Sequence, residues 1–74
     1  MPLDIAVRFG AAVRAIRRRT GISQEELADR CGLHRTYISD VELGKRNVSL
    51  ENIERLSHAL SVTIVELFEE VKKV

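Results

Sequence analysis

The strongest constraint on this chain is the regular placement of helix-ending residues along its 74 residues. Glycine, which is favoured just past the end of a helix, stands at positions 21, 32 and 44. Between these points the apolar residues recur at intervals of three and four, the period of a helix with one buried face. No segment alternates apolar and polar residues for long enough to predict a strand. The sequence therefore predicts an all-α fold of five short helices.

The first predicted helix runs from about Leu3 to Arg19 and stops at Gly21. Its apolar residues are spaced by four, four and three positions and share one face: Ile5, Phe9, Val13 and Ile16. The third predicted helix starts near Leu33, with His34 at its N-cap position, and ends at position 44. A loop over residues 45–48 then leads to the fourth.

Two capping boxes predict where the second and fifth helices begin. In such a box the N-cap hydroxyl accepts from the amide three residues later, and a glutamate there accepts from the amide of the cap. Ser23 with Glu26 has this spacing, and so has Thr63 with Glu66. Ser49 is placed to cap the fourth helix.

The second and third predicted helices form a short pair joined by a turn at Gly32. This is the arrangement of a helix-turn-helix, whose second helix lies in the major groove of DNA. The third helix has Ile38 and Val41 to dock on its own domain. Its outward side is polar and consists of Arg35, Thr36, Tyr37, Ser39 and Asp40. Arginine is the commonest reader of guanine, and a threonine methyl group can contact thymine.

The charge distribution agrees with a nucleic-acid partner for one part of the chain. Residues 1–46 carry nine basic and six acidic side chains, whereas residues 47–74 carry three and five. The net charge is therefore only +1, but it is divided unevenly. We expect the acidic outer faces of the last two helices to point away from DNA.

The sequence contains no motif typical of an enzyme, of a metal or cofactor site, or of a membrane protein. Cys31, the single cysteine, reads as a small buried hydrophobe, and with His34 and His58 it makes no nucleophile–base motif. No metal-ligand spacing or glycine-rich phosphate loop is present, so we expect no enzyme activity, metal or cofactor. The start lacks a signal peptide and no stretch could cross a bilayer, which predicts a cytoplasmic protein.

Several motifs together resemble the phage-repressor-like (Xre/Cro/cI) helix-turn-helix family over residues 9–68. They are SQEELA at 23–28, GL at 32–33, IS at 38–39 and ExGKRN at 42–47. RTYIS at 35–39, followed by Glu42 and Arg46-Asn47, most resembles the controller proteins of type II restriction–modification systems. The resemblance implies a five-helix, lambda-repressor-like domain over residues 1–74. It also implies a transcriptional regulator that binds a pseudo-palindromic double-stranded DNA operator as a homodimer.

The resemblance also implies roles for individual residues. It assigns base reading to Arg35, Thr36, Tyr37 and Arg46, and contact with the DNA backbone to Gln24, His34, Ser39, Asn47 and Ser49. It pairs Arg17 with Glu42 in a partly buried ion pair between the first and third helices. His34 stands where the family usually has Ser or Asp, so a helix cap and a phosphate contact both stay open. Tyr37 could instead pack on its own domain, and Arg18 and Arg19 could simply be solvated.

The end of the chain suggests a second subunit. Six apolar residues lie within ten positions: Val62, Ile64, Val65, Leu67, Phe68 and Val71. A fifth helix of five to seven residues cannot turn all of them into one core. We therefore expect Val62, Ile64, Val65 and Phe68 to form a homodimer interface, with a wholly buried set as the alternative.

Controllers of this kind imply further partners, namely a second dimer on the same operator and RNA polymerase. The runner-up function is another small phage-type repressor, or an antitoxin that acts through protein–protein contact. Antitoxins of this fold usually need an extra segment for the toxin, and since these 74 residues offer almost none, we expect a regulator instead.

Overall fold

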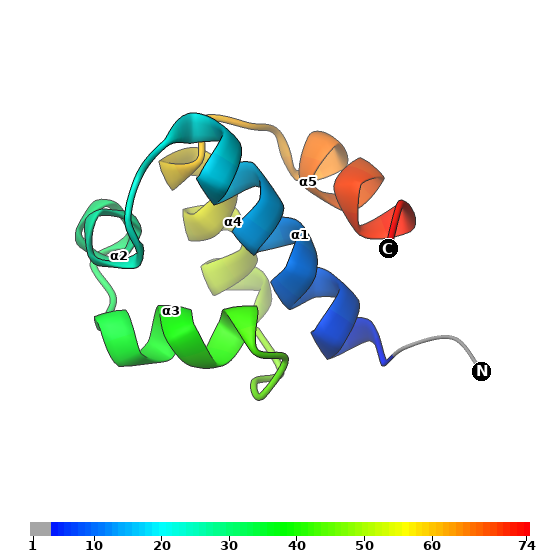
Figure 1. The fold of residues 1–74 in the computed structure, drawn as a ribbon, viewed down its shortest axis with the longest axis horizontal. Helices are drawn as coiled ribbons and strands as arrows, with labels where there is room; N and C mark the ends of the chain where they lie inside the picture. The colour runs from blue at the N-terminus through cyan, green and yellow to red at the C-terminus, as the bar shows by residue number, and fades with distance from the viewer. Residues whose placement is uncertain (1–3) are drawn as a thin grey trace.

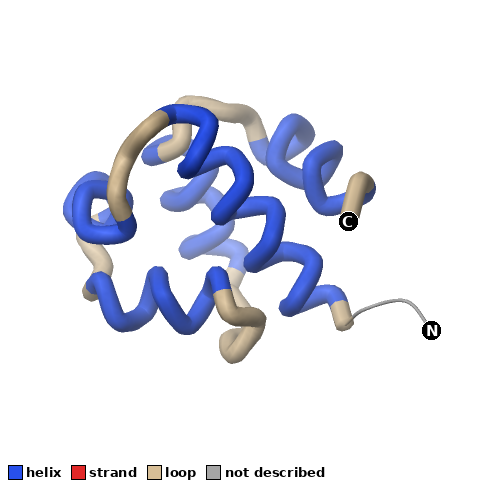
Figure 2. The backbone as a smooth tube through the Cα atoms, viewed as in Figure 1, coloured by secondary structure: helices blue, strands red, loops and turns tan. Residues whose placement is uncertain are grey.

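The computed structural model describes residues 4–74, which contain five helices and no strand (Figures 1 and 2). The helices are α1 (Ile5–Thr20), α2 (Gln24–Cys31), α3 (Arg35–Glu42), α4 (Leu50–Ala59) and α5 (Ile64–Lys72). The predicted all-α, five-helix fold is confirmed. The predicted start of the first helix at Leu3 lies outside the described residues.

Local capping chemistry sets most of the helix starts. The predicted capping box of α5 is complete: Thr63 Oγ1 accepts from the amide of Glu66 at 3.0 Å, and Glu66 accepts from the amide of Thr63 at 2.8 Å. Ser49 caps α4 as predicted, accepting from the amide of Asn52. Asp4 caps α1 through the amide of Ala6.

The box predicted at Ser23 is only half formed. Ser23 accepts from the amide of Glu26 at 3.0 Å. The Glu26 carboxylate turns instead to Arg30, one helical turn further on. The prediction of a full box was wrong because Arg30 offers that carboxylate a charged donor.

Three other predictions need correction. Ile5 is 50% exposed although it shares the apolar face of α1, because it sits in the first turn, at the margin of the core. His34 occupies the N-cap position of α3 but makes no side-chain capping bond. The fifth helix has nine residues rather than five to seven, since it continues past Phe68 to Lys72.

The core forms around α1, which packs on α3 and α5, while α2 packs on α3 and α4 (Figure 1). Its fully buried apolar side chains come from all five helices and their caps: Val13, Leu27, Ile38, Val41, Leu56, Leu60 and Leu67. The packing leaves the outer side of α3 uncovered, so the fold presents that helix at the surface.

Gly10 allows α1 and α3 to approach each other closely. A Cβ atom on Gly10 would lie 2.1 Å from the carbonyl oxygen of Val41 and 3.0 Å from that of Glu42. These obstacles are backbone atoms, which cannot swing aside as a flexible side chain could. This role of Gly10 could not be predicted from the sequence, because nothing distinguishes Gly10 from any other residue inside a helix.

We predict that Gly10→Ala destabilises the protein by about 2 kcal/mol, the range of an overpacked core. Helix propensity alone would act in the opposite direction, since alanine is favoured over glycine by up to about 1 kcal/mol. Thermal unfolding followed by circular dichroism should show a midpoint lowered by about 10 °C. An unchanged or raised midpoint would show that α1 and α3 are not held at this distance.

Candidate nucleic-acid interface

The turn between α2 and α3 has the geometry of a helix-turn-helix. Gly32 follows α2 with a φ of 68°, a left-handed conformation that glycine adopts without strain. Its amide donates back to the carbonyls of Ala28 and Asp29. The chain then passes directly into α3, where Ile38 is buried in the core and Arg35 is exposed.

The predicted base-reading residues all reach the surface around α3. Arg35, Thr36 and Arg46 are exposed, and Tyr37 is half-buried. Of the residues predicted to contact the DNA backbone, His34, Asn47 and Ser49 are exposed, whereas Gln24 and Ser39 are half-buried. The start of α3 and loop 45–48 therefore both present polar side chains to solvent, and Arg46 of the loop contacts Tyr37 and Asp40 of α3.

Arg17 and Glu42 form a two-point ion pair that ties α1 to the end of α3. Arg17 Nε lies 2.6 Å from Glu42 Oε2, and Arg17 Nη2 lies 3.0 Å from Oε1. The side chains are only 12% and 3% exposed. The hydrogen bond to Glu42 raises the pKa of the Arg17 guanidinium above its ordinary value. Arg17 Nη1 also donates to the carbonyl of Ile22, so the pair fixes the segment before α2.

Gln24, the first residue of α2, is held by the same ion pair. Its Nε2 donates to Glu42 Oε1 at 3.0 Å. A side-chain amide has two N–H donors, so one is left for another acceptor. Glu42 therefore orients Gln24 at a helix N-terminus, where free backbone amides favour an anion.

Arg46 and Tyr37 are joined to two residues whose roles the sequence did not reveal. The guanidinium carbon of Arg46 lies 5.3 Å from the centre of the Tyr37 ring, and Arg46 Nε lies 3.3 Å from Asp40 Oδ2. The Tyr37 hydroxyl accepts from Asn52 Nδ2 at 3.1 Å. Tyr37 therefore does pack against its own domain, the alternative considered for it, while one face of its ring supports Arg46.

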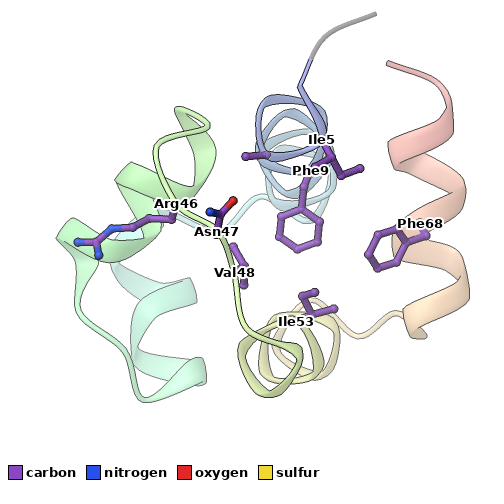
Figure 3. A pocket seen from close by; sticks show the side chains of 8 residues that line it. Ile5, Phe9, Arg46, Asn47, Val48, Ile53 and Phe68 are labelled. Carbon is purple, nitrogen blue, oxygen red and sulfur yellow. The ribbon is translucent and has the colours of Figure 1, made fainter.

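An apolar hollow lies behind this surface, between α1, loop 46–48, α4 and α5 (Figure 3). It has a volume of about 140 Å³, and Ile5, Phe9, Val48, Ile53 and Phe68 supply its apolar lining. The rings of Phe9 and Phe68 lie 5.8 Å apart. In Figure 3, Arg46 points away from these apolar side chains.

The apolar surface continues over the outer side of α4 and α5. Val65 is 70% exposed and Ile64 is also exposed, whereas Val62 and Phe68 are half-buried. The wholly buried alternative for these residues is therefore wrong, because the core accepts only Leu67 and Val71 fully. Leu50, which the sequence reasoning overlooked, is 84% exposed at the start of α4.

Within residues 4–74 no group of three or more His, Cys, Asp or Glu side chains is placed to hold a metal ion. No helix in this part of the chain has the length and apolarity needed to cross a membrane. The Cys31 thiol is buried, and burial raises its pKa.

Comparisons with known proteins agree with this geometry. A family model described as helix-turn-helix matches residues 13–67. The control protein C.BamHI of Bacillus amyloliquefaciens is 53% identical over 70 residues, 93% of this chain and 86% of that protein. The crystal structure of the restriction–modification controller protein C.AhdI from Aeromonas hydrophila superposes with a TM-score of 0.83. That protein is 49% identical, and the match covers 85% of this chain and 96% of C.AhdI.

The chain belongs to the helix-turn-helix family of restriction–modification controller proteins. A further controller, C.Esp1396I, has been solved as a tetramer bound to its natural 35-base-pair operator. It is 32% identical with a TM-score of 0.89, over 97% of this chain and 95% of that one. The family predicted from the motifs is confirmed. As a controller protein, the chain is a DNA-binding transcriptional regulator and not an enzyme.

Proposed function

We propose that this controller protein binds a pseudo-palindromic operator as a homodimer and thereby regulates restriction–modification genes together with its own. The observation that carries the proposal is the exposure of Arg35 and Thr36 at the start of α3, together with that of Arg46 on the loop that follows α3. These side chains suit the hydrogen-bonding edges of the major groove. On the opposite side of α3, the buried Ile38 and Val41 dock the helix on the apolar core.

In this proposal the polar surface divides into two kinds of contact. Arg35, Thr36 and Arg46 read bases, and Tyr37 joins them only through the part of its ring that Arg46 and its own domain leave uncovered. The residues that contact the sugar–phosphate backbone are Gln24, His34, Ser39, Asn47 and Ser49. Backbone contacts set the position of a protein on the duplex, and base contacts provide its specificity. The Ser49 oxygen caps α4, but its O–H group can still donate to a phosphate.

Arg35→Ala tests the base-reading role. If Arg35 forms two hydrogen bonds with a guanine, its loss should cost about 1–3 kcal/mol on the operator and relax the preference at one base pair. Fluorescence anisotropy with operator and scrambled duplexes, at one fixed salt concentration, measures both effects. Arg18→Ala, an exposed arginine on α1, is the matched control and should leave the preference intact. Equal losses of affinity for the operator and scrambled duplexes would show that Arg35 contacts only phosphates.

The homodimer rests on the apolar surface of the last helix. Val62, Ile64, Val65 and Phe68 face a second copy of the chain in this proposal, and a two-fold pair then matches two half-sites about 34 Å apart. The tetramer of C.Esp1396I on its operator supports a second dimer on the same DNA. Residues 1–74 then act as one DNA-binding domain that carries its own dimerisation helix.

The regulatory output completes the proposal. A controller that activates at low concentration needs an attractive contact with RNA polymerase, and at high concentration a second dimer can occlude the promoter. Such a regulator acts where the chromosome lies, which is the cytoplasm of a bacterial cell. In vitro transcription from its own promoter, with increasing protein, should rise and then fall.

A further inference from the structure

Four side chains from two helices and a loop form one connected chain beside the DNA-reading surface. Asn52 on α4 donates to the Tyr37 hydroxyl on α3 at 3.1 Å. The Tyr37 ring lies under the guanidinium of Arg46, whose carbon is 5.3 Å from the ring centre. Asp40, one turn after Tyr37 on α3, lies 3.3 Å from Arg46 Nε. Three separate contacts therefore act, directly or in sequence, on Arg46.

Each of the three contacts restricts a different motion of the Tyr37 or Arg46 side chain. The hydrogen bond from Asn52 fixes the phenol end of the half-buried Tyr37 ring. A cation within about 6 Å of an aromatic ring centre is attracted to its face, so the ring holds the guanidinium above it. The Asp40 carboxylate restrains the Nε side of the guanidinium. Together they define both the position and the rotation of an otherwise exposed arginine at the surface.

The two Nη groups of Arg46, which make no hydrogen bond or ion pair to residues 4–74, are groups with which an arginine can bind guanine. Among the described residues 4–74, neither Nη1 nor Nη2 of Arg46 has a protein partner. These two groups form the end of the guanidinium fork, which can donate two parallel hydrogen bonds to the O6 and N7 of guanine. Asp40 engages only Nε, so the ion pair and the base contact do not compete for the same donors.

We propose that Asn52 and Asp40 are positioning residues that orient Arg46 for base reading. The inference rests on the proposed function of Arg46 as a base reader. Neither positioning residue has to touch a base. Asn52 acts through the Tyr37 ring, and Asp40 acts directly on Arg46. A long side chain held in its binding orientation before the encounter loses less conformational freedom on binding, and this raises affinity for the correct sequence.

Removing Asp40 should change operator affinity in opposite directions, depending on whether Asp40 positions Arg46 or is merely a nearby negative charge. A carboxylate close to DNA repels phosphates, so removing a merely adjacent charge should strengthen binding to any duplex. A positioning carboxylate behaves differently, because its loss frees Arg46. We expect Asp40→Ala to bind scrambled DNA as well as wild type or better, yet to bind the operator about fivefold more weakly. Asp40→Asn keeps the shape of the side chain and is measured beside it.

Glu25→Ala is the matched control for charge. Glu25 is an exposed acid in the first turn of α2 and has no part in the chain of contacts to Arg46. Its removal should shift binding to both duplexes by the same factor and leave their ratio unchanged. If the ratio of operator to scrambled affinity falls with Asp40→Ala but not with Glu25→Ala, the fall reflects the position of Arg46 and not the net charge.

Asn52→Ala tests the other end of the chain. It should lower the ratio of operator to scrambled affinity about threefold, although Asn52 lies on α4 behind α3. The decisive comparison is a double-mutant cycle with Arg46→Ala. If both residues act through Arg46, then Asn52→Ala and Asp40→Ala should change the ratio little in an Arg46→Ala background. Circular dichroism on every variant shows that the proteins compared are folded.

The outcomes separate the inference from the proposed function. If Arg46→Ala leaves the ratio unchanged, then Arg46 does not read bases, and both the role and its positioning are overturned. If Arg46→Ala lowers the ratio but Asp40→Ala and Asn52→Ala shift both duplexes equally, base reading stands and the positioning inference is wrong. If only one of the two variants lowers the ratio, the other residue is not a positioning residue.

Discussion

Glu42→Ala should lower the thermal midpoint of this protein by about 15–25 °C. Glu42 is almost completely buried, and it accepts from both Arg17 and Gln24. Its removal leaves the Arg17 guanidinium largely buried, with the Ile22 carbonyl as its one remaining partner among residues 4–74. Breaking a buried ion pair at one end costs roughly 3–5 kcal/mol. In a domain of this size each kcal/mol moves the midpoint by about 4–8 °C.

A double mutant separates the pair from the packing around it. Arg17→Ala with Glu42→Ala removes both charges, so its loss of stability should be smaller than the sum of the single losses. Glu69→Ala, which breaks an exposed pair with Lys72 on α5, should change stability by less than about 0.5 kcal/mol. Thermal and urea unfolding of wild type and of these four variants measure the losses. Strictly additive losses at Arg17 and Glu42 would contradict a coupled pair.

Val65→Glu should yield a folded monomer that binds the operator at least tenfold more weakly. Because Val65 is 70% exposed, the change costs the isolated subunit little. In the proposed dimer it buries a carboxylate without a partner, which is strongly unfavourable. Phe68→Glu should have the same effect on association but also loosen the core, since Phe68 packs on Phe9.

The wild-type dimer should itself dissociate in the micromolar range. One nine-residue helix supplies most of the apolar patch, and small interfaces associate weakly. A micromolar constant corresponds to about −8 kcal/mol. A reversible dimer of this strength makes operator occupancy rise steeply with protein concentration, as an autoregulatory switch requires.

Sedimentation equilibrium with operator binding alongside tests the dimer. Glu69→Gln, an exposed change on the same helix, is the control and should leave association unchanged. The dimer model fails if wild type stays monomeric at high concentration. It also fails if a monomeric Val65→Glu protein keeps full operator affinity.

Features with local causes could be predicted from the sequence. The caps at Ser49 and Thr63 depend on residues within one turn, and the glycine at position 32 ends α2 through its own backbone freedom. These signals were enough to define five helices and the helix-turn-helix. The motifs they frame were specific enough to identify the family.

What could not be predicted depends on contacts between distant segments. Asn52 and Tyr37 lie 15 positions apart on different helices, so no periodicity connects them. The close approach at Gly10 appears only once α3 lies across α1. The exposure of Ile5 depends on where the core ends, which the helical period alone does not determine.

The central claim is that this protein recognises one DNA sequence through α3 and does so as a two-fold pair. Selection of bound duplexes from a random pool, followed by affinity measurements over a range of salt concentrations, tests it directly. We expect an enriched sequence with two inverted half-sites about one helical turn apart, and an affinity that falls linearly on a log–log plot against salt. A pool with no enriched sequence, or an affinity that does not respond to salt, would contradict it.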